Sequence, residues 1–235
     1  MASVVPVASV VPVAYVVTVN VAHPRPTPAR AGVTGIDKRP AEGRVAVRSP
    51  TGRESGIAGD LIGDPRHHGG ELQAVYAYAR EDLDSWEAVV GRPLPPGSFG
   101  ENLTTAGLDV SGARIGERWR IGAEVELQVT APRIPCRTFA TFLQRQGWVR
   151  EFTGRAQPGA YLRVLQGGTV AAGDPIVVEP PASAHDVTIG LAFRALTTRP
   201  DLLPELLASP DLTPETERRA RRHQPFELDD ETGAG

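Results

Sequence analysis

The sequence predicts an α+β protein that is mainly β, with a helical appendage at its C-terminal end. Three observations lead to this fold class. Short segments such as residues 125–129 alternate apolar and polar side chains, which is typical of a half-buried strand. The 25 glycines and 22 prolines favour many short elements joined by tight turns. Beyond Pro180 and Pro181, apolar residues recur at spacings of three and four, which indicates helices.

The first residues are apolar but interrupted. Pro6 and Pro12 break the run and no basic residue precedes it, so it matches neither a secretory signal nor a membrane helix. We expect residues 1–14 to be a disordered or extended segment. Residues 15–21 are β-branched and predict the first strand of a domain that extends to residue 182.

Within this domain, residues 44–48 predict a second short strand, and further strands are predicted at residues 125–129, 161–165 and 176–178. The strongest helical pattern is a single apolar stripe over residues 72–90. It ends at Gly91, a residue that commonly terminates helices. We therefore predict one long helix here in an otherwise β-rich domain.

Residues 183–223 are predicted to form an appendage of three short helices, at residues 187–196, 202–207 and 214–223. Thr213 followed by Pro214 is a favourable N-cap and first-turn pair. Three helices of this length bury little surface by themselves, so we expect them to pack on the larger domain or on a second subunit. Residues 224–235 predict an acidic tail.

Charge and cysteine content exclude several classes of function. With 25 basic and 28 acidic residues the net charge is −3, which gives no electrostatic reason to expect nucleic acid or an anionic membrane as partner. The single cysteine excludes an internal disulfide and a zinc site built from several thiolates. We expect a soluble, cytoplasmic protein.

The densest group of polar and glycine residues is residues 63–70. It contains His67, His68, Gly69 and Gly70, directly before the predicted helix. Glycines at a helix start leave backbone N–H groups free to bind an anion. The alternative is a glycine-rich turn whose histidines cap and solvate the helix start, and the residues alone favour neither.

Cys136 is the second candidate. A lone cysteine is commonly a small buried apolar residue. Here Arg133 and Arg137 flank it, and cationic neighbours lower the pKa of a thiol. Pro135 ends the preceding strand, so Cys136 lies at a transition from strand to loop, where functional residues often lie. A thiolate can act as a nucleophile or as a ligand for a soft metal.

Two further positions have less distinctive settings. Asn102 lies in residues 99–105, which read as an ordinary turn or as a polar group beside Gly100. Lys38 is the only lysine among the 25 basic residues, a bias for which base composition is a sufficient explanation. We find no phosphate-binding loop, dinucleotide fingerprint or nucleophile-elbow serine.

Five segments taken in order resemble one family. They are GIDKRP at residues 35–40, GD…RHHGG at 59–70, FGENLTT at 99–105, IGERWRIG at 115–122 and VTAPRIPC at 129–136. This order is similar to MOSC-domain proteins (molybdenum cofactor sulfurase C-terminal domain), in the YiiM-like subfamily, which has a C-terminal three-helix appendage. The resemblance covers about residues 15–222 and implies a MOSC-type β-barrel domain over residues 15–182.

The resemblance also implies a molybdenum cofactor (molybdopterin), with Cys136 as the catalytic residue and the protein ligand to the metal. Lys38, Asn102 and Arg133 match family positions that line the cofactor pocket, together with His67, His68, Gly69 and Gly70. Two departures weaken the match: Glu71 to Ala74 replace a common Pro-Asp-Lys-Ala, and Arg137-Thr138 replace an aromatic residue followed by lysine.

The activity implied is reduction of N-hydroxylated compounds, such as N-hydroxylated purines, to amines. The implied partners are a small substrate and a separate electron-donating reductase, with a homodimer as a candidate assembly. The first alternative is a cofactor carrier or sulfur-transfer module without turnover. The second is a zinc hydrolase using His67, His68 and Cys136, for which no catalytic carboxylate is placed beside the histidines.

Overall fold

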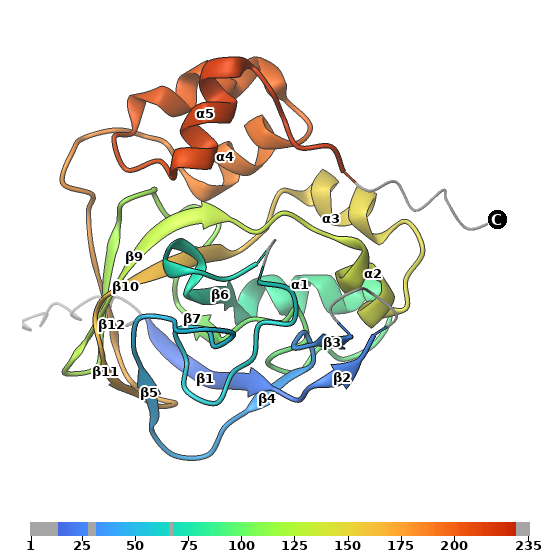
Figure 1. Cartoon of the computed structure of the whole chain (residues 1–235), viewed down its shortest axis with the longest axis vertical. Helices are drawn as coiled ribbons and strands as arrows, with labels where there is room; N and C mark the ends of the chain where they lie inside the picture. Colours follow the sequence, from blue (N-terminus) through green and yellow to red (C-terminus); the bar gives the residue numbers. More distant parts are fainter. Residues whose placement is uncertain (1–13, 28–31, 66–67, 229–235) are drawn as a thin grey trace, which may run out of the picture.

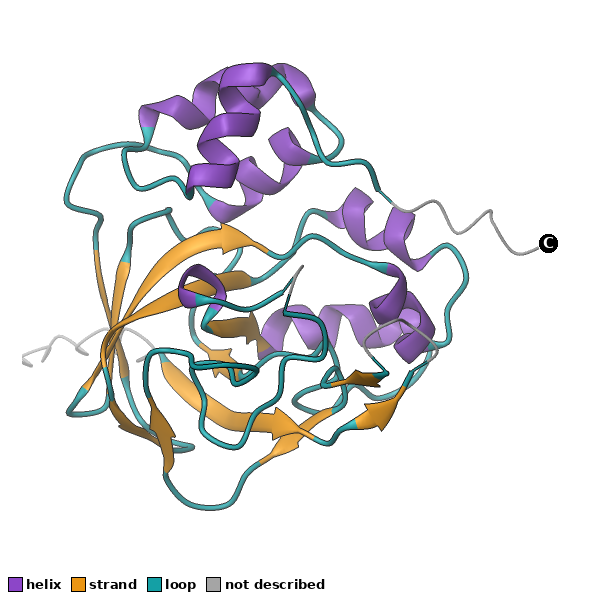
Figure 2. Cartoon of the chain, viewed as in Figure 1, coloured by secondary structure: helices purple, strands orange, loops and turns teal. Residues whose placement is uncertain are grey.

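A computed structural model describes residues 14–27, 32–65 and 68–228. The expectations for residues 1–13, for His67 and for residues 229–235 lie outside this range. The chain folds as α+β, with strands gathered on one side and helices at the top and right of the view in Figure 2. None of the described helices is long and apolar enough to cross a membrane.

The main sheet has eight strands in the order β12-β8-β9-β10-β6-β7-β1-β4. All neighbouring pairs are antiparallel except β6 and β7, so the sheet is mixed. Its strands are β1 (Tyr15–Ala22), β4 (Lys38–Pro40), β6 (Val75–Ala79), β7 (Leu103–Ala106), β8 (Arg118–Ile121), β9 (Val125–Pro132), β10 (Ala160–Gln166) and β12 (Ile176–Glu179). Two small antiparallel pairs complete the β structure: β2 (Arg25–Pro26) with β3 (Val33–Thr34), and β5 (Val45–Val47) with β11 (Gly168–Val170).

The sheet curls so that strands from its two ends meet. The Val16 N–H donates to the Asp174 carbonyl at 3.0 Å, and the Gly173 N–H donates to the Val16 carbonyl at 2.8 Å. An isolated bridge joins Tyr15 to Pro175 beside them. These bonds connect the start of β1, the neighbour of the edge strand β4, with the start of β12, the other edge strand; the β-barrel itself stays a prediction.

The strands predicted at residues 15–21, 44–48, 125–129, 161–165 and 176–178 are all present within one residue of these bounds, except that β9 extends three residues further, to Pro132. The long helix predicted over residues 72–90 is wrong in its first half. A three-residue 3-10 turn, Glu71–Gln73, leads into β6, and the α-helix α1 spans only Arg80–Val90. All five residues of β6 are buried, because this strand lies between β10 and β7 inside the sheet.

Two helices of the larger domain were not predicted. They are α2 (Arg137–Leu143), which begins directly after Cys136, and α3 (Trp148–Arg155). With α1 they enclose a second core in which Trp86, Phe99 and Trp148 are fully buried against one another. This aromatic core packs against the junction between β9 and α2 that carries Cys136, and the packing fixes the position of that junction.

The C-terminal appendage consists of α4 (Ile189–Leu196), a 3-10 helix (Pro200–Ala208) and α5 (Pro214–Arg222), close to the predicted bounds. The Thr213 hydroxyl accepts a hydrogen bond from the Thr216 N–H at 3.2 Å, as expected of the N-cap. Figure 1 shows the appendage lying over β9 and β10. Apolar residues of all three helices belong to the same core cluster as the sheet, which confirms that they pack on the larger domain.

The start of α1 carries a carboxyl group that destabilises the fold at neutral pH. Burial, with the nearby carboxylates Asp109 and Glu81, raises the pKa of Asp82 to about 6. The folded state therefore binds this proton more tightly than the unfolded chain, and stability falls as the pH rises from the unfolded pKa through about 6. We expect Asp82→Asn to raise the free energy of unfolding by roughly 1–2 kcal/mol at about pH 8 and by little at about pH 4. Urea denaturation at both pH values measures this, and an equal gain at both contradicts the assignment.

Candidate active site around Cys136

Cys136 lies between β9 and α2. Pro132 ends the strand and Pro135 cannot extend it, so the chain turns and α2 starts. Cys136 occupies the N-cap position with extended backbone angles, and its carbonyl accepts hydrogen bonds from the Phe139 and Ala140 N–H groups at 3.0 and 3.2 Å. Its side chain makes no cap hydrogen bond and is partly exposed. The sulfur is therefore available to a ligand while the backbone around it is fixed.

The thiol of Cys136 is acidic. Burial by itself raises its pKa, but a hydrogen bond from His68, the positive charge of Arg133 and the Phe139 N–H together outweigh burial. The resulting pKa is about 7, below the ordinary value of 9.0, so about half of the thiol is ionised at neutral pH. Arg137 was also expected to lower the pKa of Cys136, but it is exposed on α2. The residues that lower this pKa are His68 and Arg133.

Arg133 is a buried cation, 8% exposed. Its Nη1 donates to the Phe99 carbonyl, and its guanidinium carbon lies 4.9 Å from the Tyr76 ring centroid and 4.4 Å from that of Phe139. Within the part of the chain that is described, no carboxylate forms an ion pair with it. A buried guanidinium held by aromatic rings and one carbonyl retains its charge for an anion, and the thiolate of Cys136 is one such anion.

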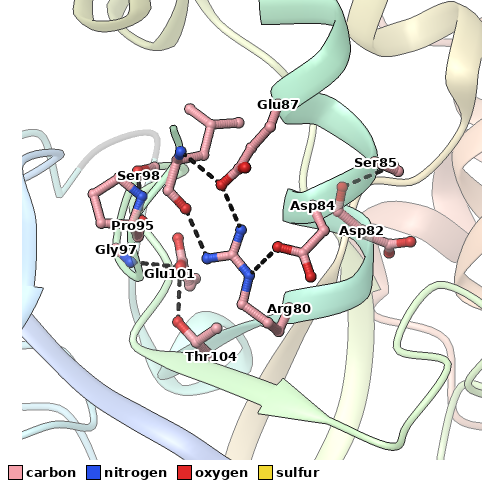
Figure 3. A network of polar contacts seen from close by, with 11 residues as sticks. Arg80, Asp82, Asp84, Ser85, Glu87, Pro95, Gly97, Ser98, Glu101 and Thr104 are labelled. Atoms are coloured by element: carbon pink, nitrogen blue, oxygen red, sulfur yellow. Dashed lines mark hydrogen bonds and ion pairs between the residues drawn. The ribbon is translucent and has the colours of Figure 1, made fainter. Parts of the chain in front are cut away.

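The loop between α1 and β7 supplies the carbonyl that holds Arg133, and it is anchored from two sides (Figure 3). The fully buried Glu101 accepts hydrogen bonds from the Phe99 N–H at 3.0 Å and from the Thr104 hydroxyl at 2.8 Å. From α1, Arg80 donates to the Leu94 carbonyl at 2.7 Å. These contacts fix the position of Phe99 and, through it, that of the guanidinium.

His68 and the two glycines approach Cys136 from the opposite side. Gly69 and Gly70 both have positive φ, 82° and 79°, which makes a tight turn that brings His68 to the thiol. The sequence predicted an anion site at the start of a helix directly after Gly70. In the described structure a three-residue 3-10 turn follows Gly70 in place of that helix, so the site does not have the predicted form. The Gly69 N–H donates instead to the Gln73 side chain at 3.2 Å.

Lys38 and Asn102 lie in a separate buried cluster around Asp60. One Asp60 oxygen accepts from Lys38 Nζ and from the Ala22 N–H, and the other accepts from Asn102 Nδ2 at 2.8 Å. Asn102 also accepts from the Tyr76 N–H at 3.1 Å, so it joins β1, β6 and β7. Direct contact of these two residues with a cofactor stays a prediction. In the structure they stabilise the sheet edge next to the site.

A cavity of about 450 Å³ opens beside His68, between β9, β10 and the appendage. A second, of about 490 Å³, lies on the other side of α2 and includes Arg25, Arg39 and Arg92. Sequence reasoning missed the aromatic residues that shape the site, namely Tyr76, Phe139 and Tyr161. For Tyr76 the available signal was the alternation of tyrosine with alanine in residues 76–79. In the described residues no three His, Cys, Asp or Glu side chains form a metal-binding group.

Comparisons with known proteins identify the family of this chain. A family model described as the MOSC domain matches residues 64–177, which include the junction at Cys136. Uncharacterized protein YflK of Bacillus subtilis is 39% identical over 140 residues, 60% of this chain and 61% of YflK. A protein of Gibberella moniliformis named Reductase is 32% identical over 167 residues, 66% of this chain and 28% of that protein. The chain is therefore a MOSC-domain protein.

Within this family the chain is YiiM-like. Protein YiiM of Escherichia coli is 30% identical over 143 residues, 58% of this chain and 61% of YiiM. The crystal structure of YiiM from Geobacillus stearothermophilus has a TM-score of 0.72 at 27% identity, covering 89% of this chain and 98% of that one. That of Escherichia coli YiiM has a TM-score of 0.64 at 24% identity, covering 81% and 89%. The matched regions span less than two thirds of each of the three curated relatives.

The acidity of Cys136 can be tested on cofactor-free protein. We expect iodoacetamide to alkylate Cys136 with a rate that rises through a midpoint near pH 7, because only the thiolate reacts. His68→Ala removes the hydrogen bond that lowers the pKa, so the midpoint should move upward by about one pH unit. The single cysteine makes total alkylation, followed by mass spectrometry, a direct measure. A midpoint near 9 in the unsubstituted protein contradicts the assigned environment.

Proposed function

We propose that this protein binds the molybdenum cofactor through Cys136 and reduces N-hydroxylated compounds, such as N-hydroxylated purine bases, to amines. The observation that carries the proposal is the acidic thiol of Cys136 beside Arg133, a buried cation that no described carboxylate neutralises. The MOSC family, to which the chain belongs, is associated with this cofactor. The homologue named Reductase favours a catalytic role over the role of a cofactor carrier.

The residues at the site fit this group. A thiolate is a soft ligand that suits a transition metal with sulfur coordination, and Cys136 is already half ionised near pH 7. Arg133 is buried and positively charged, so it would hold an anionic part of the cofactor such as its phosphate or its dithiolene-bearing side. His68 would occupy the position between the thiol and the cavity of about 450 Å³.

Reduction of R–NHOH to R–NH₂ breaks the N–O bond, consumes two electrons and two protons, and releases water. When bound, the molybdenum centre supplies the two-electron chemistry for this bond. His68 can hold a proton at the thiol side of the cavity and donate it toward the departing oxygen. The electrons come from a separate electron-donating reductase, which we propose as the physiological partner together with the small substrate.

Purification from a host that makes the molybdenum cofactor tests the proposal. We expect about one molybdenum per chain and reduction of N6-hydroxyadenine to adenine with chemically reduced methyl viologen as donor. Bound molybdenum without any reduction would favour the carrier or sulfur-transfer alternative. Stoichiometric zinc in place of molybdenum, with hydrolytic activity, would overturn both.

A further inference from the structure

The cavity of about 450 Å³ is shared between the larger domain and the appendage; we call it the appendage pocket. Its inner wall includes His68 and Tyr161, and its outer wall includes Leu196, Arg218 and Phe226. Ligand sites are commonly concave pockets of about 300–1,000 Å³ with an apolar lining and a few polar groups. The appendage pocket has this size and this mixture.

The outer wall is held rigidly. The Ile189 N–H donates to the Ala113 carbonyl at 2.9 Å and the Gly190 N–H to the Ser111 carbonyl at 2.8 Å, so the first turn of α4 is bonded to the larger domain. A further bridge joins Thr188 to Arg114. Because the appendage also shares the main apolar core, its position relative to β9 and β10 is fixed.

Phe226 is fixed although it follows the last helix. Its N–H donates to the Leu196 carbonyl at 2.8 Å, and the Arg219 guanidinium lies 3.6 Å from its ring centroid. Arg219 also donates to the Pro225 carbonyl at 3.0 Å, which ties this segment back to α5. The Phe226 ring therefore has a fixed position on the outer wall before any ligand binds.

The pocket adjoins the thiol. His68 lines it and also hydrogen-bonds Cys136. Tyr161 lines it as well, and the charges of Arg133 and Cys136 act on its hydroxyl from nearby. A molecule in the pocket would thus have one end at His68, which lies beside Cys136, and the other end at the appendage.

We propose that the appendage pocket holds the ring of a planar aromatic N-hydroxylated substrate, and that Phe226 and Arg218 of the appendage determine the preference for such rings. This inference rests on the proposed function. Two aromatic side chains, Tyr161 and Phe226, offer faces for stacking on a planar ring. Arg218 is exposed and forms no ion pair with the described residues, so its guanidinium is available to a ring nitrogen or oxygen.

Two substrates that differ in the planarity of their ring separate this inference from a general effect on catalysis. N6-hydroxyadenine is planar, whereas N-cyclohexylhydroxylamine carries a saturated ring. We expect Phe226→Leu and Arg218→Ala each to raise KM for N6-hydroxyadenine by about tenfold, with kcat for it and kcat/KM for the saturated substrate within about twofold of the unsubstituted protein. Arg222→Ala is the matched control, since Arg222 is an exposed arginine of the same helix that does not line the pocket.

Calorimetric binding of adenine to cofactor-free protein gives a readout independent of turnover, and we expect Phe226→Leu to weaken it by about tenfold. If the unsubstituted protein reduces neither substrate, the proposed function fails, while adenine binding still decides whether the pocket takes a planar ring. Equal loss on both substrates, loss of molybdenum in the Arg218→Ala variant, or unchanged adenine binding in Phe226→Leu overturns the inference.

Discussion

Replacing Cys136 with serine is expected to lower the reduction of N-hydroxylated substrates by about a hundredfold or more and to lower the molybdenum content of the purified protein. Serine has nearly the same size, but its hydroxyl stays protonated at neutral pH and is a hard donor. Activity with reduced methyl viologen and metal analysis on the same preparation measure both effects.

The fold should tolerate this change. Cys136 is the N-cap of α2 but makes no side-chain cap hydrogen bond, and serine is a preferred N-cap residue. We therefore expect the melting temperature of Cys136→Ser to equal or exceed that of the unsubstituted protein, and that of Cys136→Ala to lie slightly below Cys136→Ser. Both variants should lose activity to the same degree. Near-normal activity with molybdenum bound in either one would make Cys136 a structural residue.

Much of the sheet could be predicted because its strands alternate clearly. Residues 125–129 carry apolar side chains at every second position, and the resulting strand β9 extends to Pro132, four residues before Cys136. In the appendage, Thr213 and Pro214 marked the start of α5 to the residue. Local signals of this kind do not depend on what packs against the element.

The helix predicted over residues 72–90 shows where local signals are insufficient. Leu72, Val75, Tyr76 and Ala79 have helical spacing, but β6 is buried on both faces and therefore contains no polar residue to reveal a period of two. Its neighbours in the sheet are β10, more than eighty residues later, and β7. Such pairing decides the structure of the segment and is not visible within it.

Helices α2 and α3 were missed for a related reason. Both are short, seven and eight residues, and three of their seven buried side chains are aromatic. Phe139, Trp148 and Phe152 pack on one another across the two helices, so tertiary contacts stabilise elements with weak intrinsic preference. The stretch reads as a loop when each side chain is considered alone.

The candidate site was predicted in part. The structure brings Arg133 and His68 to Cys136, as the order of motifs implied. Lys38 and Asn102 share a cluster with Asp60 instead, a residue of the GD…RHHGG segment for which the sequence predicted no role. The difference arises because a motif fixes the neighbourhood of a residue, whereas the direction of its side chain depends on buried partners. Asp60 binds both side chains and fixes their direction.

Arg133→Met is expected to separate function from stability. The guanidinium is buried without an ion pair to any described carboxylate, so its desolvation is not offset by a charged partner in the protein. Methionine keeps most of the volume between Tyr76 and Phe139 and removes the buried charge. We expect the free energy of unfolding to change by less than about 1 kcal/mol, the loss of the Phe99 hydrogen bond being balanced by relief of the buried charge.

The functional effect of Arg133→Met should be large. Removing the cation raises the pKa of Cys136, so the alkylation midpoint near pH 7 should move upward by about one unit. Without a charge to hold an anionic cofactor, activity should fall by about a hundredfold, with molybdenum content falling in parallel. Arg137→Ala is the matched control: Arg137 also adjoins Cys136 in sequence but is exposed, and its loss should leave midpoint and activity unchanged. A strongly destabilised Arg133→Met protein, or equal effects of the two arginine variants, would show that Arg133 supports the fold and that another group binds the anion.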